Sequence, residues 1–191
     1  NRRGVFSARD FVQATLDVIG RNASVILEKN VGKNGARQEY AVHLYVLDGN
    51  GLPLNQLMLE ELQSYLRRNA PIMLDEMIYV SNRPFWGTHL MVDAALRPGV
   101  SPQKVSQEIK AKIERWFHPN RFVKRSVLIA NEVEYQVRRS RGTDYVSGVM
   151  FSESGTPDSF SAVNFTLPAP RYAPLLSGLR VNLTQGSRTF N

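Results

Sequence analysis

The sequence predicts an α+β fold built from two small α/β units in tandem, followed by an extended, proline-rich C-terminal tail. Twice, a strand of alternating apolar residues runs through a Gly/Pro turn into an amphipathic helix, first over residues 40–68 and again over 88–117. After residue 154 prolines become frequent and charged residues rare. We therefore expect mixed or antiparallel sheets with helices on one face, and domains at 1–83, 84–154 and 155–191.

Composition permits a folded core and excludes several kinds of chemistry. Of the 191 residues, 42% are apolar, which is enough to bury a core. The chain has no cysteine, so disulfides, thiol catalysis and cysteine-ligated metals are excluded, and a reducing compartment is favoured. No apolar run approaches the roughly 18 residues of a membrane span, so no membrane partner is expected. Residue 1 is asparagine rather than methionine, which is compatible with a piece of a longer protein and leaves that question open.

A helix is predicted to open the first unit, beginning at Ser7 and ending at Gly20. Asp10 follows Ser7 at the spacing of a capping box, and its charge suits a helix N-terminus. Apolar residues recur at helical spacing from Phe11 to Ile19, and Gly20 is placed to stop the helix.

A strand hairpin is predicted next. Val25 and Leu27 begin one strand, residues 31–35 form a polar turn rich in glycine, and residues 40–46 alternate over a second strand. Two strands joined in this way are typical of an antiparallel pair.

A second helix and a short strand complete the first unit. Pro53 suits the first turn of a helix, where its missing N–H leaves no hydrogen bond unmade. The apolar stripe of this helix comprises Leu54, Leu57, Met58, Leu62, Tyr65 and Leu66. Residues 77–80 form a short strand, and Asn82-Arg83-Pro84 is interpreted as the connector to the second unit.

The second unit repeats the order of strand and helix. Residues 90–96 place apolar side chains on one face of a strand. Ser101 is a good N-cap and Pro102 fits the first helical position, so a helix follows with its apolar face over residues 105–117.

Residues 123–137 fit two patterns. Their alternation indicates a strand, whereas Ile129, Val133 and Val137 stack at helical spacing, and propensity leaves both readings open. Residues 145–151 form the next strand.

The tail contains too many apolar residues for a solvated linker. We expect it to lie on its own domain or on a neighbouring subunit. Residues 161–167 and 179–183 are candidates for short strands within it.

No set of polar residues reads as an active site. His43, His89 and His118 lack metal-binding spacing, the glycines lack the Lys-Ser or Lys-Thr of a phosphate-binding loop, and no serine lies in a nucleophile elbow. We therefore expect no catalytic, cofactor-binding or metal-binding residues and no cofactor, and the chain is interpreted as a protein without enzymatic activity. A hydrolase would require an unrecognised site.

Eight residues are candidates for interaction. Two of them are the aromatic pair before the second unit, and six form two basic clusters in a chain of net charge +7: Phe85, Trp86; Arg121, Lys124, Arg125; Arg138, Arg139, Arg141. The aromatic pair fits a core plug between the units better than a subunit contact. The clusters fit a solvated surface or an acidic protein partner better than a nucleic-acid-binding module, because charge alone does not specify a partner.

The order of segments over about residues 4–153 carries a family resemblance. Its residues are Val5-Phe6-Ser7-Ala8-Arg9-Asp10-Phe11, then 39–46 as an exposed-edge strand, 57–66 as a helix, 87–93 as a strand, 100–119 as a helix ending in Phe117-His118-Pro119, 126–133 as a helical segment and 142–149 as a closing strand. In this order they resemble the baseplate J-like proteins, the wedge subunits of contractile phage tails and related injection machines.

The resemblance implies a structural role. Wedge subunits of this family form the inner ring of a baseplate around a central hub, pair with a second copy or a paralogue, and relay the trigger for sheath contraction. The resemblance therefore implies other wedge subunits as partners, with hub and sheath proteins as further neighbours. It implies a location in the tail baseplate of a virion assembled in the host cytoplasm.

Overall fold

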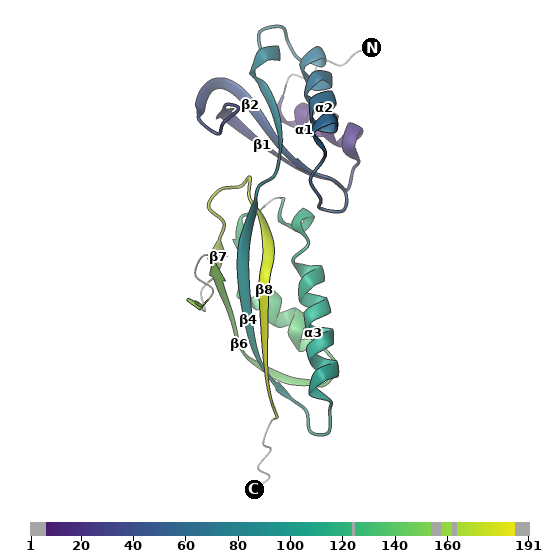
Figure 1. Cartoon of the computed structure of the whole chain (residues 1–191), viewed down its shortest axis with the longest axis vertical. Helices are drawn as coiled ribbons and strands as arrows, with labels where there is room; N and C mark the ends of the chain where they lie inside the picture. The colour runs from purple at the N-terminus through teal and green to yellow at the C-terminus, as the bar shows by residue number, and fades with distance from the viewer. Residues whose placement is uncertain (1–6, 124, 154–157, 162–163, 186–191) are drawn as a thin grey trace. The chain divides into compact units, whose positions relative to one another are not determined.

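The computed structural model describes residues 7–123, 125–153, 158–161 and 164–185 and separates the chain into two compact units (Figure 1). The first unit comprises Asn1–Pro84 with two short returns of the chain, Phe122–Lys124 and Ala169–Ala173. The second comprises Phe85–Arg121, Arg125–Pro168 and Pro174–Asn191. Helices and small sheets occur in both, which confirms the predicted α+β class.

The first unit holds a three-stranded sheet of order β1-β2-β3. Its elements in chain order are α1 (Ala8–Ile19), β1 (Ser24–Val31), β2 (Arg37–Leu47), α2 (Gln56–Asn69), the short 3₁₀ helix η1 (Asp75–Met77) and β3 (Ile78–Asn82). β1 and β2 form the predicted antiparallel hairpin, and β3 joins β2 in parallel.

β2 is the central strand of this sheet, so the expectation that residues 39–46 form an exposed edge is wrong. Residues from His43 to Leu47 are all buried, on both faces of the strand. A strand buried on two faces is most stable with neighbours on both sides, because every backbone group then has a partner.

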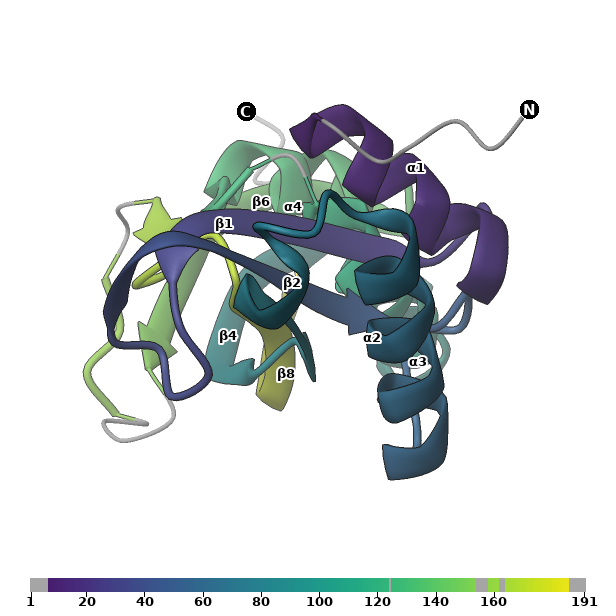
Figure 2. The ribbon, with the colours of Figure 1, turned by 90° about the horizontal axis from the view of Figure 1, so that it is seen from above.

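The helices α1 and α2 cover one face of the sheet (Figure 2). α1 begins as predicted, because the Ser7 Oγ accepts a hydrogen bond from the Asp10 amide at 3.2 Å and Asp10 Oδ2 accepts one from the Ser7 amide at 2.9 Å. The shared core consists of Phe11, Val25, Leu44, Val46, Leu54, Leu62, Leu66, Ile78 and Val80.

Residues from the C-terminal part of the chain cover the other face of the same sheet. Arg171 Nη1 donates to Glu28 Oε2 at 2.9 Å and to the Tyr45 hydroxyl at 3.1 Å, and its guanidinium lies 5.6 Å from the centre of the Tyr45 ring. Segment 169–173 thus lies on the chain's own first unit.

Arg83 is almost completely buried, at 1% exposure, and links several segments on this face through hydrogen bonds. Its guanidinium donates to the Ser24 hydroxyl at 2.7 Å and to the carbonyl oxygens of Phe122 at 3.3 Å, Pro170 at 3.5 Å, Arg171 at 3.2 Å and Tyr172 at 2.8 Å. Burial lowers the pKa of Arg83 to about 10, since the surrounding groups are neutral. The predicted connector is therefore also a structural centre of the first unit.

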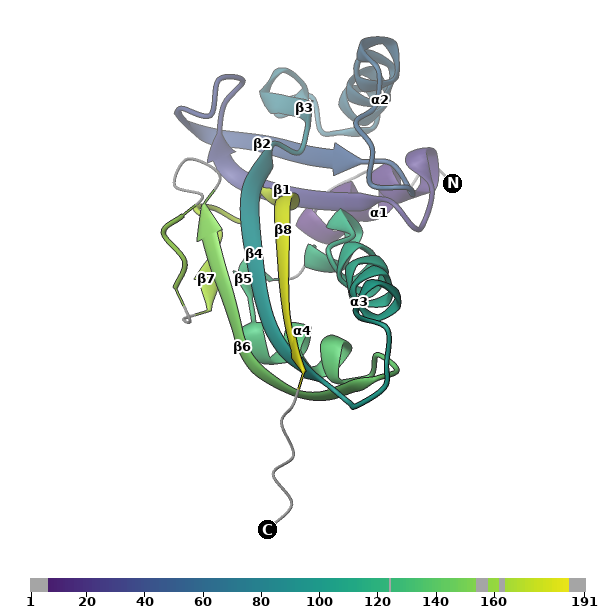
Figure 3. The same cartoon turned by 60° about the horizontal axis from the view of Figure 1, so that its bottom comes forward.

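The second unit holds a three-stranded sheet of order β6-β4-β8 and a small sheet of β5 and β7 (Figure 3). Its elements are β4 (Phe85–Leu96), α3 (Pro102–Trp116), the 3₁₀ helix η2 (Pro119–Phe122), β5 (Val127–Leu128), α4 (Ala130–Arg138), β6 (Thr143–Glu153), β7 (Phe165–Thr166) and β8 (Ala173–Gln185). β6 is antiparallel to β4.

β8 runs parallel to β4. The Ala173 amide donates to the Pro84 carbonyl, Gly178 lies against His89, and Asn182 donates to Asp93 at 2.7 Å, so contacts advance together along both strands. The residues of β8 were expected to be largely extended tail, with a short strand at 179–183. They instead form a full strand, because β4 offers a hydrogen-bonding edge 89 residues earlier in the sequence.

The two helices of the second unit lie on one face of its sheet. Ile109 and Ile113 of α3 and Val133 and Val137 of α4 are fully buried, as are Leu90 and Val92 of β4. Residues 123–137, which fitted both patterns, contain the two-residue strand β5 followed by the helix α4. Burial of Val133 and Val137 one helical turn apart decides in favour of helix.

Candidate interaction surfaces

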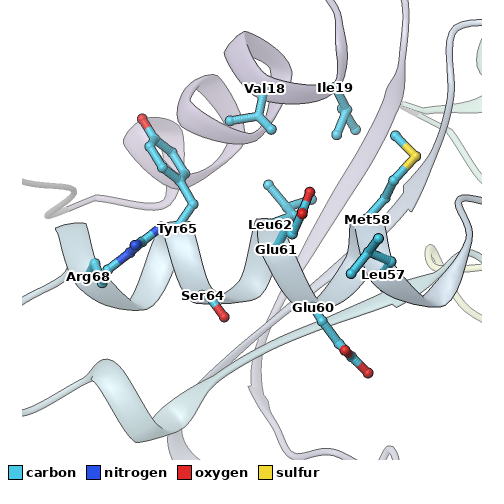
Figure 4. Close-up of a pocket in the computed structure, with 10 residues that line it drawn as sticks. All are labelled: Val18, Ile19, Leu57, Met58, Glu60, Glu61, Leu62, Ser64, Tyr65 and Arg68. Carbon is cyan, nitrogen blue, oxygen red and sulfur yellow. The ribbon is translucent and has the colours of Figure 1, made fainter.

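A groove with a partly apolar lining lies between α1 and α2 and has a volume of about 680 Å³ (Figure 4). We call it the α1/α2 groove. It is lined by Val18, Ile19, Leu57, Met58, Glu60, Glu61, Leu62, Ser64, Tyr65 and Arg68. Four large apolar side chains in it remain open to solvent: Val18 is 50% exposed, Leu57 64%, Met58 44% and Tyr65 36%. Apolar side chains gathered around a depression are typical of a protein interaction site.

The groove arises because the apolar stripe of α2 is wider than its own core requires. Leu62 and Leu66 of that stripe are buried, as is Leu54 just before the helix, whereas Leu57, Met58 and Tyr65 remain exposed. Full burial of a side chain of this size contributes about 1.5–3 kcal/mol, so burial of all three by a partner would stabilise the complex. The excess width of the stripe is the sequence signal for this surface.

Two further apolar side chains lie just beyond α2. Ile72 is 90% exposed and Met73 91%, in the turn that separates α2 from η1. Such exposure of two neighbouring apolar residues adds to the apolar surface that the first unit presents.

The described residues of the two predicted basic clusters lie around α4 in the second unit. Arg125 precedes α4 and forms a bidentate ion pair with Glu132, with N–O distances of 2.5 and 2.6 Å. The Arg125 guanidinium holds the pKa of the Glu132 carboxyl below its usual value. Arg121 is exposed in η2, and Lys124 lies outside the described residues.

The other basic cluster lies at the opposite end of α4, so that helix separates the two clusters. Arg138 pairs with Glu134, and Arg139 lies over the Tyr135 ring at 5.5 Å. The Arg141 backbone amide donates to Glu108, which also pairs with Lys112 at 2.9 Å. Acidic side chains of the same unit thus offset part of the charge of both clusters, and charge alone gives them no defined partner.

Phe85 and Trp86, the remaining candidates, begin β4. Both are half-buried in the second unit. They therefore contribute to the start of the β6-β4-β8 sheet.

His43 is a buried histidine with a defined tautomer. Its Nδ1 lies 3.0 Å from the Gly32 carbonyl oxygen, which can only accept, so Nδ1 carries the proton and Nε2 accepts from the Ser81 hydroxyl at 2.9 Å. The ring stacks on Tyr45 at 4.2 Å. Burial lowers the pKa of His43 below its ordinary value.

This lowered pKa predicts that acid destabilises the first unit. Below pH 6.5 the unfolded imidazole binds a proton that the folded ring resists, so stability should fall from there until the pH passes the folded pKa. We expect the free energy of unfolding to fall as the pH drops from neutral through about 6.5, and to fall less in the variant His43→Gln. Urea unfolding across this range tests the prediction, and equal pH dependence in both proteins would contradict it.

Among the residues that the structure describes, no group of three or more His, Asp or Glu side chains is arranged to hold a metal ion. No helix in that part of the chain is long and apolar enough to cross a membrane.

Comparison with known proteins finds similarity among solved structures. No protein-family model matches the chain, and no curated protein matches it either. A chain in the cryo-EM structure of the anti-feeding prophage (AFP) baseplate, symmetrised six-fold, superposes with a TM-score of 0.53. The two chains share a fold. The match covers 73% of this chain at 10% sequence identity, and it spans only 29% of the AFP chain.

Proposed function

We propose that this chain is a structural subunit of the baseplate of a contractile tail or injection machine and has no enzymatic activity. The observation that carries the proposal is the fold shared with a chain of the AFP baseplate. The order of sequence segments supports it independently, since it resembles the baseplate J-like proteins. The α1/α2 groove supports an assembly role, because it is apolar, exposed and flanked by charge.

The more specific role that we propose is that of a wedge subunit. In this role the chain assembles with other wedge subunits around the central hub and relays the trigger for sheath contraction. Two compact units joined by several passages of the chain suit such a role, because each unit can present its own surface to a neighbour. In a closed ring, many moderate contacts add up, since each contact raises the effective concentration for the next.

The proposal is tested in the organism that encodes the chain. Contractile particles purified from it should contain the chain, as detected by mass spectrometry. Deletion of its gene should leave particles without complete baseplates, and expression in trans should restore them. Particles with normal composition and contraction after the deletion would contradict the proposal.

The nucleic-acid alternative makes a different prediction for the isolated protein. A module that binds through the basic clusters would bind generic DNA with an affinity that falls steeply as salt rises. For a baseplate subunit we expect little such binding. Tight, salt-sensitive DNA binding that is lost in the variant Arg139→Glu would favour the alternative.

A further inference from the structure

We infer that the α1/α2 groove binds the α1/α2 groove of a second copy of this chain, with the two α2 helices antiparallel about a two-fold axis. The inference rests on the proposed assembly function and specifies one partner for it. Charge, shape and the position of exposed apolar residues on α2 each support it.

The charge pattern of the groove is complementary to that of a second, inverted copy. Glu61 and Arg68 both line it and lie seven residues apart on α2, which is two helical turns or about 10 Å. Within the described part of the chain, neither side chain makes a hydrogen bond or an ion pair. A groove that is acidic at one end and basic at the other matches an inverted copy of itself, because Glu61 of each copy then faces Arg68 of the other.

This register also pairs side chains of suitable size near the axis. If Glu61 faces Arg68 of the second copy, the two-fold axis passes between Ser64 and Tyr65. The Tyr65 ring, 36% exposed, then lies beside the small Ser64 side chain of the second copy. Tyrosine is common in the centre of protein interfaces because it buries a large apolar ring while its hydroxyl keeps a polar partner.

The same arrangement accounts for the exposed apolar residues at the ends of α2. Antiparallel pairing brings the turn after one α2 toward the beginning of the other. Ile72 and Met73, which are 90% and 91% exposed, then approach Leu57 and Met58 of the second copy. In a two-fold contact of this kind, each of these apolar residues is buried in both copies.

Sedimentation velocity over a wide range of concentrations tests the inference on the isolated full chain. The chain should show a monomer–dimer equilibrium. Each single charge reversal, Glu61→Arg or Arg68→Glu, places like charges opposite each other at two positions and should weaken dimerisation by about tenfold or more. The double variant E61R/R68E restores both attractive pairs and should dimerise within about threefold of the unaltered chain.

Mixing the two single variants gives the most specific outcome. In a heterodimer of E61R with R68E, two arginines of one copy face two glutamates of the other, so the mixture should associate more tightly than either variant alone. The controls Glu114→Arg and Arg115→Glu make the same charge changes on exposed positions of α3 and should leave dimerisation unchanged. Circular dichroism verifies that every variant is folded.

Three outcomes would overturn the inference. The first is a chain that stays monomeric at every concentration, which would leave the groove for a different protein. The second is a dimer that neither reversal weakens. The third is a weakened dimer that neither the double variant nor the mixture restores. Because only the isolated chain is measured, each of these outcomes is distinct from a failure of the particle experiment.

Discussion

Replacement of Arg83 by methionine should destabilise the first unit by about 2–4 kcal/mol. The variant removes the donors that serve Ser24 and the carbonyl groups of Phe122, Pro170, Arg171 and Tyr172. Buried acceptors that lose their donors each cost about 1–3 kcal/mol, and relief of the buried charge offsets part of this loss. Lysine should be intermediate, because it keeps the charge but lacks the planar fork of donors.

Arg37→Met is the matched control. Arg37 begins β2 in the same unit and is exposed, so its replacement should change stability by less than about 0.5 kcal/mol. Both tryptophans, Trp86 and Trp116, belong to the second unit, so their fluorescence follows that unit while circular dichroism follows both. If R83M and R37M unfold at the same urea concentration by circular dichroism, the structural role assigned to Arg83 is wrong.

Replacement of Gly142 by alanine should destabilise the second unit by about 2–5 kcal/mol. Gly142 lies just before β6 with a φ of +91°, a backbone conformation that costs any other residue about 1–2 kcal/mol. A methyl group there would also lie 2.5 Å from Val100 Cγ1 and 3.0 Å from Val105 Cγ2. Relief of these contacts requires Val100 and the α3 residue Val105 to shift, and overpacking of this kind costs about 1–3 kcal/mol.

Gly99→Ala separates the two contributions. Gly99 has a similar φ of +79°, but an added methyl group would have no neighbour within 4 Å. It should therefore cost only the backbone strain, about 1–2 kcal/mol. Urea unfolding followed by tryptophan fluorescence measures both variants, and equal stability of G142A and G99A would show that packing against α3 contributes nothing.

The sequence predicted the local elements well because their signals are local. The Ser7–Asp10 capping box, the β1–β2 hairpin and the helix that follows Ser101 each depend on residues a few positions apart. The sequence did not decide the secondary structure of segment 123–137, because its five alternating apolar residues also fit a strand. Burial of Val133 and Val137 against the sheet selects the helix.

Long-range contacts explain what the sequence did not reveal. β8 depends on an edge of β4 that is 89 residues away in sequence, so its composition alone resembled a tail. Arg83 stands in a polar connector motif, and its five acceptors come from segments that meet only in the folded unit. The sequence showed the apolar stripe of α2 that lines the α1/α2 groove. Which residues of that stripe are buried depends on how α1 packs beside α2 in the folded unit.

A cryo-EM reconstruction of the contractile particle from the organism that encodes this chain tests most directly whether the chain works by fitting against other subunits. We expect density for both units in the baseplate, with the α1/α2 groove covered by protein. A complete baseplate without density for this chain, or a chain in the baseplate whose groove faces solvent on every copy, would contradict it.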